Sequence, residues 1–111
     1  MKRGEIWTVA GGGGYAGKPR PAVIVQANEF EHTASITVVL FTSNEADAPL
    51  YRILVEPSVD NGLAMASRMM ADKTMTLPRE QLGDRIGKLG NTDVIRLNRA
   101  IIVFLGLAGS D

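Results

Sequence analysis

The sequence has no cysteine and only one histidine, His32. The absence of cysteine excludes disulfides, thiolate zinc sites and a cysteine nucleophile. A single histidine excludes a histidine-rich metal site and a pair of histidines that act as acid and base. We therefore expect a protein that uses no metal and no other cofactor. His32 could serve as a general base, but its polar surroundings favour a surface residue.

Net charge and long apolar segments are absent as well. Twelve Lys and Arg residues balance twelve Asp and Glu residues, so any binding of nucleic acid must come from a local cluster of cations. The longest apolar run, residues 100–105, is far too short to cross a bilayer. The charged residues 1–5 are unlike a secretory signal. We expect one cytoplasmic domain, residues 1–111, with no membrane contact.

The first two thirds of the chain have the pattern of β-strands. Runs rich in β-branched residues are separated by turn-forming segments such as residues 57–62, which contain Asn-Gly. Two of the runs show little polar alternation, as in strands buried on both faces. The expected strands cover residues 5–10, 21–26, 35–41, 51–56, 67–71, 73–77 and 86–89, and the two that flank Asp72 can also be one bent strand.

The last part of the chain is predicted to be a helix. Asn91 or Thr92 can cap its start, apolar residues follow at helical spacing, and Gly106 can end it. The apolar positions broaden over residues 101–105, which predicts a helix end buried on more than one side. Together the elements predict a mainly β fold, a strongly bent antiparallel sheet or small barrel with a C-terminal helix.

Arg20 is the most informative single residue of the sequence. It lies between Pro19 and Pro21, which favour extended backbone, where the four glycines of residues 11–14 lead toward an apolar strand. An arginine held in this way typically binds a phosphate or a carboxylate. The alternative is a solvated charge at the start of a strand.

Three motifs form an ordered series along the chain: KRGEIW at residues 2–7, GKPRPAVIV at residues 17–25 and VLFTS at residues 39–43. The series resembles the MazF/PemK toxins, and the match continues to the terminal helix. That family consists of sequence-specific, metal-independent endoribonucleases, which form homodimers on an SH3-like barrel. The resemblance implies cleavage of single-stranded RNA in a groove that spans the dimer. It also implies silencing by a cognate antitoxin, whose acidic disordered tail orders as it binds.

The resemblance assigns the chemistry to Arg20 and Thr42. Cleavage of RNA without a metal requires activation of the 2′-OH, stabilisation of a pentavalent phosphorane and protonation of the departing 5′-oxygen. A guanidinium offers two parallel N–H donors to phosphate oxygens and stays protonated, which suits charge stabilisation and proton donation. Thr42, assisted by Ser43, can hold a nonbridging oxygen. From its position alone, Thr42 would be a strand-end threonine that hydrogen-bonds the next turn.

Four further residues are expected to contact the RNA: Tyr15, Lys18, Ser43 and Asp72. Tyr15 can stack on an unpaired base. It follows the glycines of residues 11–14, which replace a polar, Glu-containing stretch found in many relatives. These glycines can close over a ligand through their backbone N–H groups or act as a linker.

The surroundings of Asp72 depart from the family pattern. Some relatives carry an Arg-x-Asp pair here, and Met70 stands at the position of that arginine. Asp72 can accept hydrogen bonds from Arg20 or from a base. A salt bridge with Lys73 or Arg68 is the alternative.

Several apolar side chains can either fill the core or bind a partner protein. Core filling is the expected role of the loose methionine cluster and of the terminal helix face. A surface for a dimer partner or an antitoxin peptide is the alternative for the same residues, which are Met65, Met69, Met70, Met75, Ile101, Phe104 and Leu105.

A second functional interpretation is a poison of DNA gyrase. Residues 67–70 and the terminal helix also resemble CcdB, which has the same barrel fold and acts by protein–protein contact. CcdB ends in Trp-Gly-Ile and lacks the Arg-Pro motif, whereas this chain has the motif and ends without tryptophan. Both differences favour the endoribonuclease. A family member that only binds RNA or its antitoxin is a third alternative.

Overall fold

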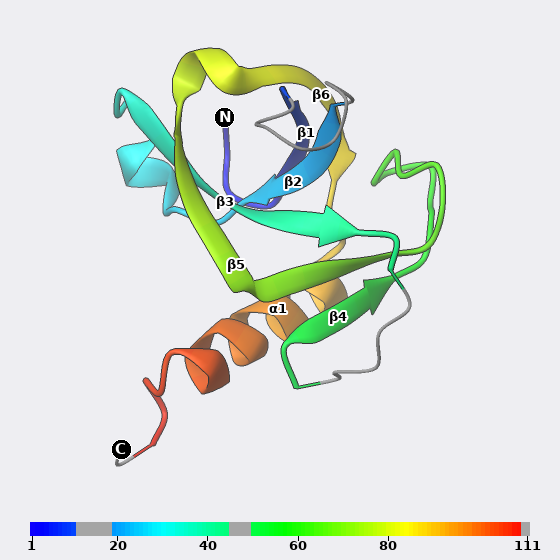
Figure 1. Ribbon diagram of the computed structural model, residues 1–111, viewed down its shortest axis with the longest axis vertical. Coiled ribbons are helices and arrows are strands. Elements are labelled where there is room, and N and C mark those ends of the chain that lie inside the picture. Colours follow the sequence, from blue (N-terminus) through cyan, green and yellow to red (C-terminus); the bar gives the residue numbers. More distant parts are fainter. Residues whose placement is uncertain (11–18, 45–49, 110–111) are drawn as a thin grey trace.

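The computed structural model describes residues 1–10, 19–44 and 50–109 (Figure 1). Its strands are β1 (Glu5–Val9), β2 (Arg20–Ile24), β3 (Ser35–Thr42), β4 (Arg52–Val55), β5 (Ser67–Pro78) and β6 (Leu82–Lys88). Helix α1 (Asn91–Phe104) follows the strands, and two 3-10 turns, η1 (Asn28–Phe30) and η2 (Arg79–Gln81), precede β3 and β6. The predicted mainly β fold with a C-terminal helix is confirmed. The glycines of residues 11–14 lie outside the described residues.

The six strands form one antiparallel sheet in the order β4-β5-β3-β2-β1-β6. Figure 1 shows the sheet curling around the N-terminus, with α1 beside β4 and β5. Within the described residues β4 and β6 form the two ends of the sheet. The predicted SH3-like barrel is therefore an open one.

Strand β3 is buried on both of its faces, as its β-branched sequence with little polar alternation predicts. One face contributes Val39 and Phe41 to a core that includes Leu97 of α1. The opposite face contributes Ile36 and Val38 to a second core on the other side of the sheet. Full burial of a side chain such as Phe41 stabilises the fold by about 1.5 to 3 kcal/mol. The two cores meet at β3, which makes this strand the centre of the fold.

Strands β5 and β6 differ from their predicted bounds. β5 is one strand, as the alternative interpretation proposed, and its pairing with β3 shifts register between Val39 and Phe41. β6 begins at Leu82, four residues before the expected start at residue 86. The prediction missed the first part of β6 because Gly83 and Asp84 are exposed and lack an apolar pattern. Pairing of Leu82 with Val9 of β1 places this segment in the sheet.

The two ends of α1 are capped by glycine residues. Gly90 occupies the N-cap and no side chain caps the first turn, so the predicted caps Asn91 and Thr92 are wrong. At the other end Gly106 adopts a φ of 73°. Its N–H donates to the carbonyl of Val103 at 3.2 Å, and the N–H of Leu107 donates to that of Ile102 at 2.9 Å. This is a Schellman motif, and it confirms Gly106 as the end of the helix.

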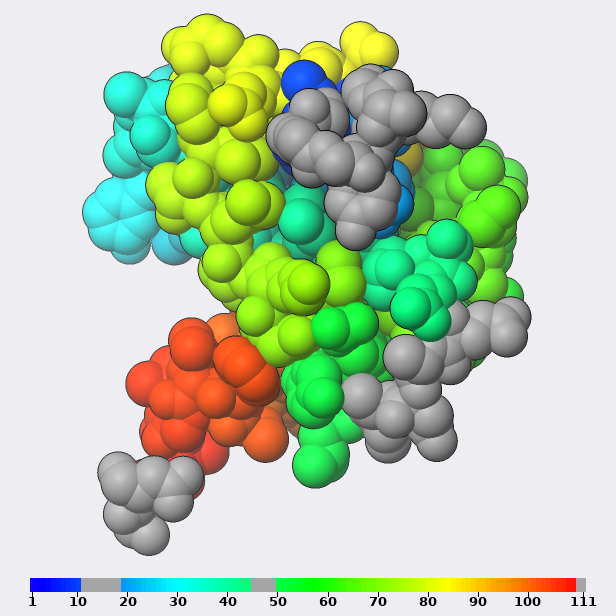
Figure 2. Space-filling model, viewed as in Figure 1, coloured from blue at the N-terminus to red at the C-terminus, as the bar shows by residue number. Residues whose placement is uncertain are grey.

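The C-terminal end of α1 is exposed, although its broad apolar pattern predicted burial on more than one side. Val103, Phe104 and Leu105 retain 55%, 46% and 57% of their accessible surface. Figure 2 shows this end of the helix, in orange and red, standing out from the rest of the molecule. Only Leu97 and Ala100 are fully buried in α1. The helix therefore packs on the sheet from Val94 to Ile101, and its last turn is exposed.

The methionine cluster divides between the core and the surface. Met69 and Met70 are buried, which confirms core filling for these two. Met65 and Met75 are exposed. His32 has a side chain that is 91% exposed, and the prediction of a surface histidine is confirmed.

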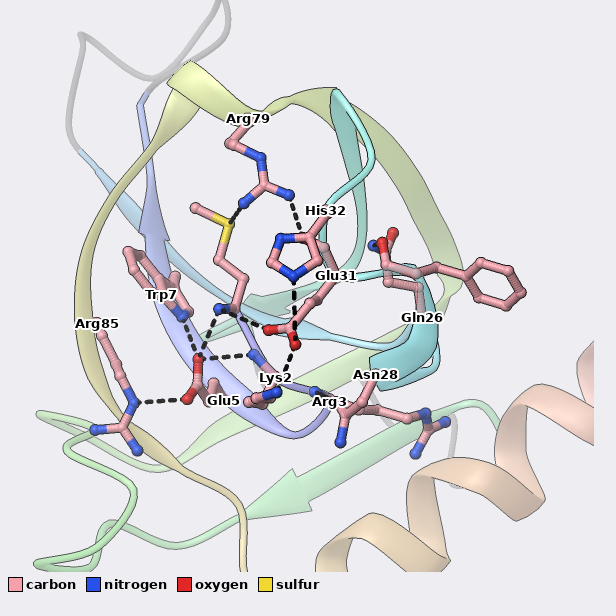
Figure 3. Close-up of polar contacts among 12 residues, drawn as sticks. Lys2, Arg3, Glu5, Trp7, Gln26, Asn28, Glu31, His32, Arg79 and Arg85 are labelled. Carbon is pink, nitrogen blue, oxygen red and sulfur yellow. Dashed lines mark hydrogen bonds and ion pairs between the residues drawn. The ribbon is translucent and has the colours of Figure 1, made fainter.

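The KRGEIW motif builds a polar network at the start of β1 (Figure 3). The carboxylate of Glu5 accepts hydrogen bonds from the backbone N–H of Lys2 and from the indole of Trp7, both at 3.0 Å. Arg85 of β6 forms an ion pair with it at 3.2 Å. Burial raises the pKa of Glu5, but the Lys2 amide, the Trp7 indole and nearby positive charges together leave it below the usual value. Glu5 therefore links β1 to β6 through its ion pair with Arg85.

Arg3, another residue of the same motif, links the sheet to helix α1. Its Nε donates to the carbonyl of Val25 at 2.8 Å, and its Nη2 donates to Oδ1 of Asn98 in α1 at 2.7 Å. The motif that suggested a family thus has a structural role in its first residues.

The Asn-Gly turn predicted at residues 57–62 packs closely against the backbone of β6. The buried amide of Asn61 donates to the carbonyl of Glu56, and its oxygen accepts from the N–H groups of Ser58 and Leu63. Gly62 has a φ of 68°. A Cβ atom on Gly62 would lie 2.0 Å from the carbonyl oxygen of Ile86. Only glycine fits this close approach of two backbone segments.

We expect Gly62→Ala to lower the free energy of unfolding by at least about 2 kcal/mol, because it combines a backbone clash with an unfavourable φ. Urea denaturation at a fixed protein concentration measures the change. Gly90→Ala is the control for steric effects, because no atom lies within 4 Å of its added Cβ. Loss of a glycine N-cap should cost this variant no more than about 1 kcal/mol. Equal stability of the two variants would contradict the proposed role of the turn.

Candidate active site

Arg20 begins β2 and pairs with Val9 of β1. Its side chain is half-buried. On its other side, β2 pairs with β3, and Ala22 lies opposite Leu40. Continuing this antiparallel register by two residues along each strand brings Arg20 level with Thr42. The two predicted catalytic residues thus reach the same edge of the sheet from different strands.

Thr42 ends β3, and its hydroxyl oxygen accepts a hydrogen bond from the backbone N–H of Asn44 at 3.1 Å. This contact is the one expected for a strand-end threonine. It also fixes the orientation of the hydroxyl, because the oxygen is occupied as an acceptor while its own O–H can still donate. Both interpretations of Thr42 are therefore compatible with the observed geometry.

Arg68 of β5 lies directly opposite Thr42 across the β3–β5 pair. Residues opposite one another in an antiparallel sheet project from the same face, so the two side chains are neighbours. Nη1 of Arg68 donates to the carbonyl of Asn44 at 3.4 Å. The sequence analysis considered Arg68 only as a partner for Asp72. No local pattern could have placed it beside Thr42, because the register of two strands decides the contact.

Asp72 forms an ion pair with Arg52 of β4. Within the described residues it accepts no hydrogen bond from Arg20, and neither of the alternative partners, Lys73 and Arg68, forms an ion pair with it. Nε and Nη2 of Arg52 donate to the two carboxylate oxygens at 2.7 and 2.8 Å. The hydrogen bond from Arg52 holds the pKa of Asp72 below its usual value and raises that of Arg52. A carboxylate bound on both oxygens by one guanidinium is not available to neutralise Arg68.

The remaining predicted RNA contacts are divided between described and undescribed parts of the chain. Ser43 is exposed and directly follows β3, next to Thr42. Tyr15 and Lys18 lie outside the described residues.

Residues 1–10, 19–44 and 50–109 contain no group of three His, Asp or Glu side chains placed to hold a metal ion. The helices in these ranges include none that is long and apolar enough to span a membrane.

Comparison with known proteins extends this picture. Residues 2–105 match the family described as PemK-like, MazF-like toxin of type II toxin–antitoxin system. The chain belongs to this toxin family. It is 51% identical over 109 residues to the "Probable endoribonuclease MazF" of Mycolicibacterium smegmatis, with 98% of this chain and all of that protein covered. It is 31% identical to the "Endoribonuclease MazF9" of Mycobacterium tuberculosis, with 96% and 98% covered.

A solved structure gives the same result for the fold of the toxin. An "Endoribonuclease in complex with its cognate antitoxin from Mycobacterial species" superimposes with a TM-score of 0.79 at 29% identity, and 96% of each chain is covered. The family resemblance and the barrel-like fold predicted from the sequence are confirmed. The comparisons lend no support to the CcdB-like alternative.

We expect Asp72→Asn to destabilise the toxin by about 1 to 2 kcal/mol at pH 7, because Arg52 loses a charged partner. The pKa of Asp72 is lower in the folded state than in the unfolded chain. The stabilisation is therefore complete above the unfolded-state pKa and is lost as the pH falls through the folded-state value. Urea denaturation of wild type and variant should show a stability difference that shrinks below about pH 4.

Asp84→Asn is the control for this experiment, since the carboxylate of Asp84 forms no ion pair within the described residues. A difference between Asp72→Asn and wild type that stays constant from pH 7 to about pH 3 would show that the ion pair is not its source.

Proposed function

We propose that this toxin is a sequence-specific endoribonuclease that cleaves single-stranded mRNA without a metal ion, and that Arg20 and Thr42 perform the reaction. The observation that carries the proposal is the pairing of Ala22 in β2 with Leu40 in β3. Continued by two residues along each strand, this register brings the arginine of the Arg-Pro motif level with the last residue of β3. The endoribonuclease names of its relatives support the reaction class. We place the protein in the cytoplasm, where its substrate is found.

The reaction follows from the donors present on this edge of the sheet. As the 2′-hydroxyl loses its proton to water, its oxygen attacks the adjacent phosphorus. The bond from phosphorus to the 5′-oxygen breaks, Arg20 protonates the departing oxygen and regains a proton from solvent, and a 2′,3′-cyclic phosphate and a 5′-hydroxyl result. Two N–H groups of Arg20 bind the phosphate oxygens on which negative charge develops. The Thr42 hydroxyl, oriented by the N–H of Asn44, donates to a nonbridging oxygen. Ser43 is close enough along the chain to assist.

Two protein partners belong to the proposal. The exposed apolar side chains at the end of α1 support a homodimer, because a patch of this kind commonly marks a contact between proteins. A related endoribonuclease has been solved in complex with its cognate antitoxin. We propose an antitoxin with an acidic, disordered tail, whose carboxylates would complement the cations near Thr42.

Cleavage of a long single-stranded RNA in EDTA tests the catalytic assignment. We expect Arg20→Ala and Thr42→Val each to reduce the cleavage rate about 100- to 1000-fold, which is typical for loss of one preorganised donor to a developing oxyanion. Thr42→Ser keeps the hydroxyl and should retain most of the activity. Arg99→Ala, a change on an exposed face of α1, serves as control. Undiminished cleavage by Arg20→Ala or Thr42→Val would remove that residue from the mechanism.

Sedimentation velocity at micromolar concentration tests the dimer. We expect the wild type to sediment as a dimer and Val103→Asp to shift toward the monomer, because a charge would be buried in the interface. The exposed position of Val103 in the single chain makes the substitution compatible with folding. A monomeric wild type would contradict the proposed groove between two copies.

A further inference from the structure

Arg68 and Arg52 project from the same face of the sheet but differ in their ionic environment. Arg68 lies opposite Leu54 of β4, two residues along the strand from Arg52. Asp72 binds Arg52 through both carboxylate oxygens. Among the described residues no carboxylate forms an ion pair with Arg68. Of these two arginines, Arg52 is therefore neutralised, whereas the charge of Arg68, next to Thr42, is not balanced in this way.

The position of Arg68 is set by the pairing of β5 with its two neighbouring strands. Its backbone pairs on one side with Thr42 of β3 and on the other with Leu54 of β4. The side chain is half-buried, and Nη1 contacts the carbonyl of Asn44. A guanidinium has five N–H groups, so most of its donors stay available to a ligand. A preorganised cation with free donors is suited to bind an anion.

Arg68 lies close enough to Thr42 for both side chains to contact one ligand. Opposite residues in an antiparallel pair have Cβ atoms about 4.5 to 5.5 Å apart, so Arg68 and Thr42 can contact the same stretch of a ligand. Arg20 approaches Thr42 from β2 and Arg68 approaches it from β5, on the opposite side of β3. Figure 1 shows β3, β5 and β4 side by side in the sheet. Thr42 is thus flanked by a cation on each side.

We propose that Arg68 binds the backbone phosphate next to the scissile one and so positions the RNA across Thr42. The assignment rests on the proposed function, since it takes the scissile phosphate to lie between Arg20 and Thr42. A contact to a neighbouring phosphate is made equally in the ground state and the transition state. It therefore contributes to substrate binding and to KM, and leaves kcat largely unchanged.

The salt dependence of RNA binding tests the assignment directly. The probe is a fluorescent 2′-O-methyl oligonucleotide with the sequence of a segment that the wild type cleaves, because it lacks the attacking hydroxyl. Arg68→Gln should weaken binding about tenfold, as expected for loss of a charged hydrogen bond. The slope of log K against log salt should decrease by about 0.7, the contribution of one phosphate contact to a single strand. Arg68→Lys should restore most of the slope.

Arg99→Gln is the matched control, because it removes the same charge from an exposed position on α1. Cleavage kinetics of the unmodified oligonucleotide provide a second readout. Arg68→Gln should raise KM about tenfold and change kcat by less than about threefold, whereas Arg20→Ala should lower kcat. These opposite patterns separate positioning of the substrate from stabilisation of the transition state.

Three results would overturn the assignment of Arg68. The first is a salt slope for Arg68→Gln equal to that of the wild type, with RNA cleavage intact. The second is a fall in kcat at unchanged KM. The third is unchanged RNA binding together with loss of binding to an acidic peptide, which would indicate an antitoxin contact instead. A wild type that cleaves no RNA, yet binds a 2′-O-methyl oligonucleotide of random sequence with an Arg68-dependent salt slope, would refute the proposed function alone.

Discussion

The pairing of β3 with β5 is the constraint on which the rest of this structure depends. The ladder runs from the pair Ser35–Pro78 to the pair Thr42–Arg68 and shifts register between Val39 and Phe41. β3 supplies side chains to both cores, so its two faces cannot exchange without exposing one set of apolar residues. The register of the ladder is therefore strongly determined. Strand β4 attaches to β5, strand β2 attaches to β3, and α1 covers one face.

The same ladder places the chemistry of the site. Because Thr42 and Arg68 end the ladder, the core packing of β3 and β5 fixes the backbone positions from which these two side chains project. The Arg52–Asp72 ion pair lies on the same face, and Arg52 binds both carboxylate oxygens of Asp72 on β5. For the proposed RNA site this separation matters, since an unpaired carboxylate beside Arg68 would compete with phosphate. The polar network around Glu5 and Arg3 stabilises the framework at a different part of the sheet.

The fold was more predictable than the site. β-Branched runs located β1 to β4 because local propensity and burial act in the same direction there. The predictions failed where tertiary contacts decide the outcome. The first part of β6 has no apolar pattern and becomes a strand only by pairing with β1. The composition of the end of α1 predicts burial, yet Val103, Phe104 and Leu105 are exposed, although the ring of Tyr51 contacts that of Phe104.

By itself the sequence determined the family, the strand-rich fold, the turn at Asn61–Gly62 and the helix end at Gly106. These features depend on near neighbours in the chain or on motifs, and both can be read in linear order. Only the tertiary structure decided that Asp72 pairs with Arg52 and that Arg68 lies beside Thr42. The physical reason is that a cross-strand contact depends on register. Register is set by the packing of two whole cores, and no residue type in the sequence specifies it alone.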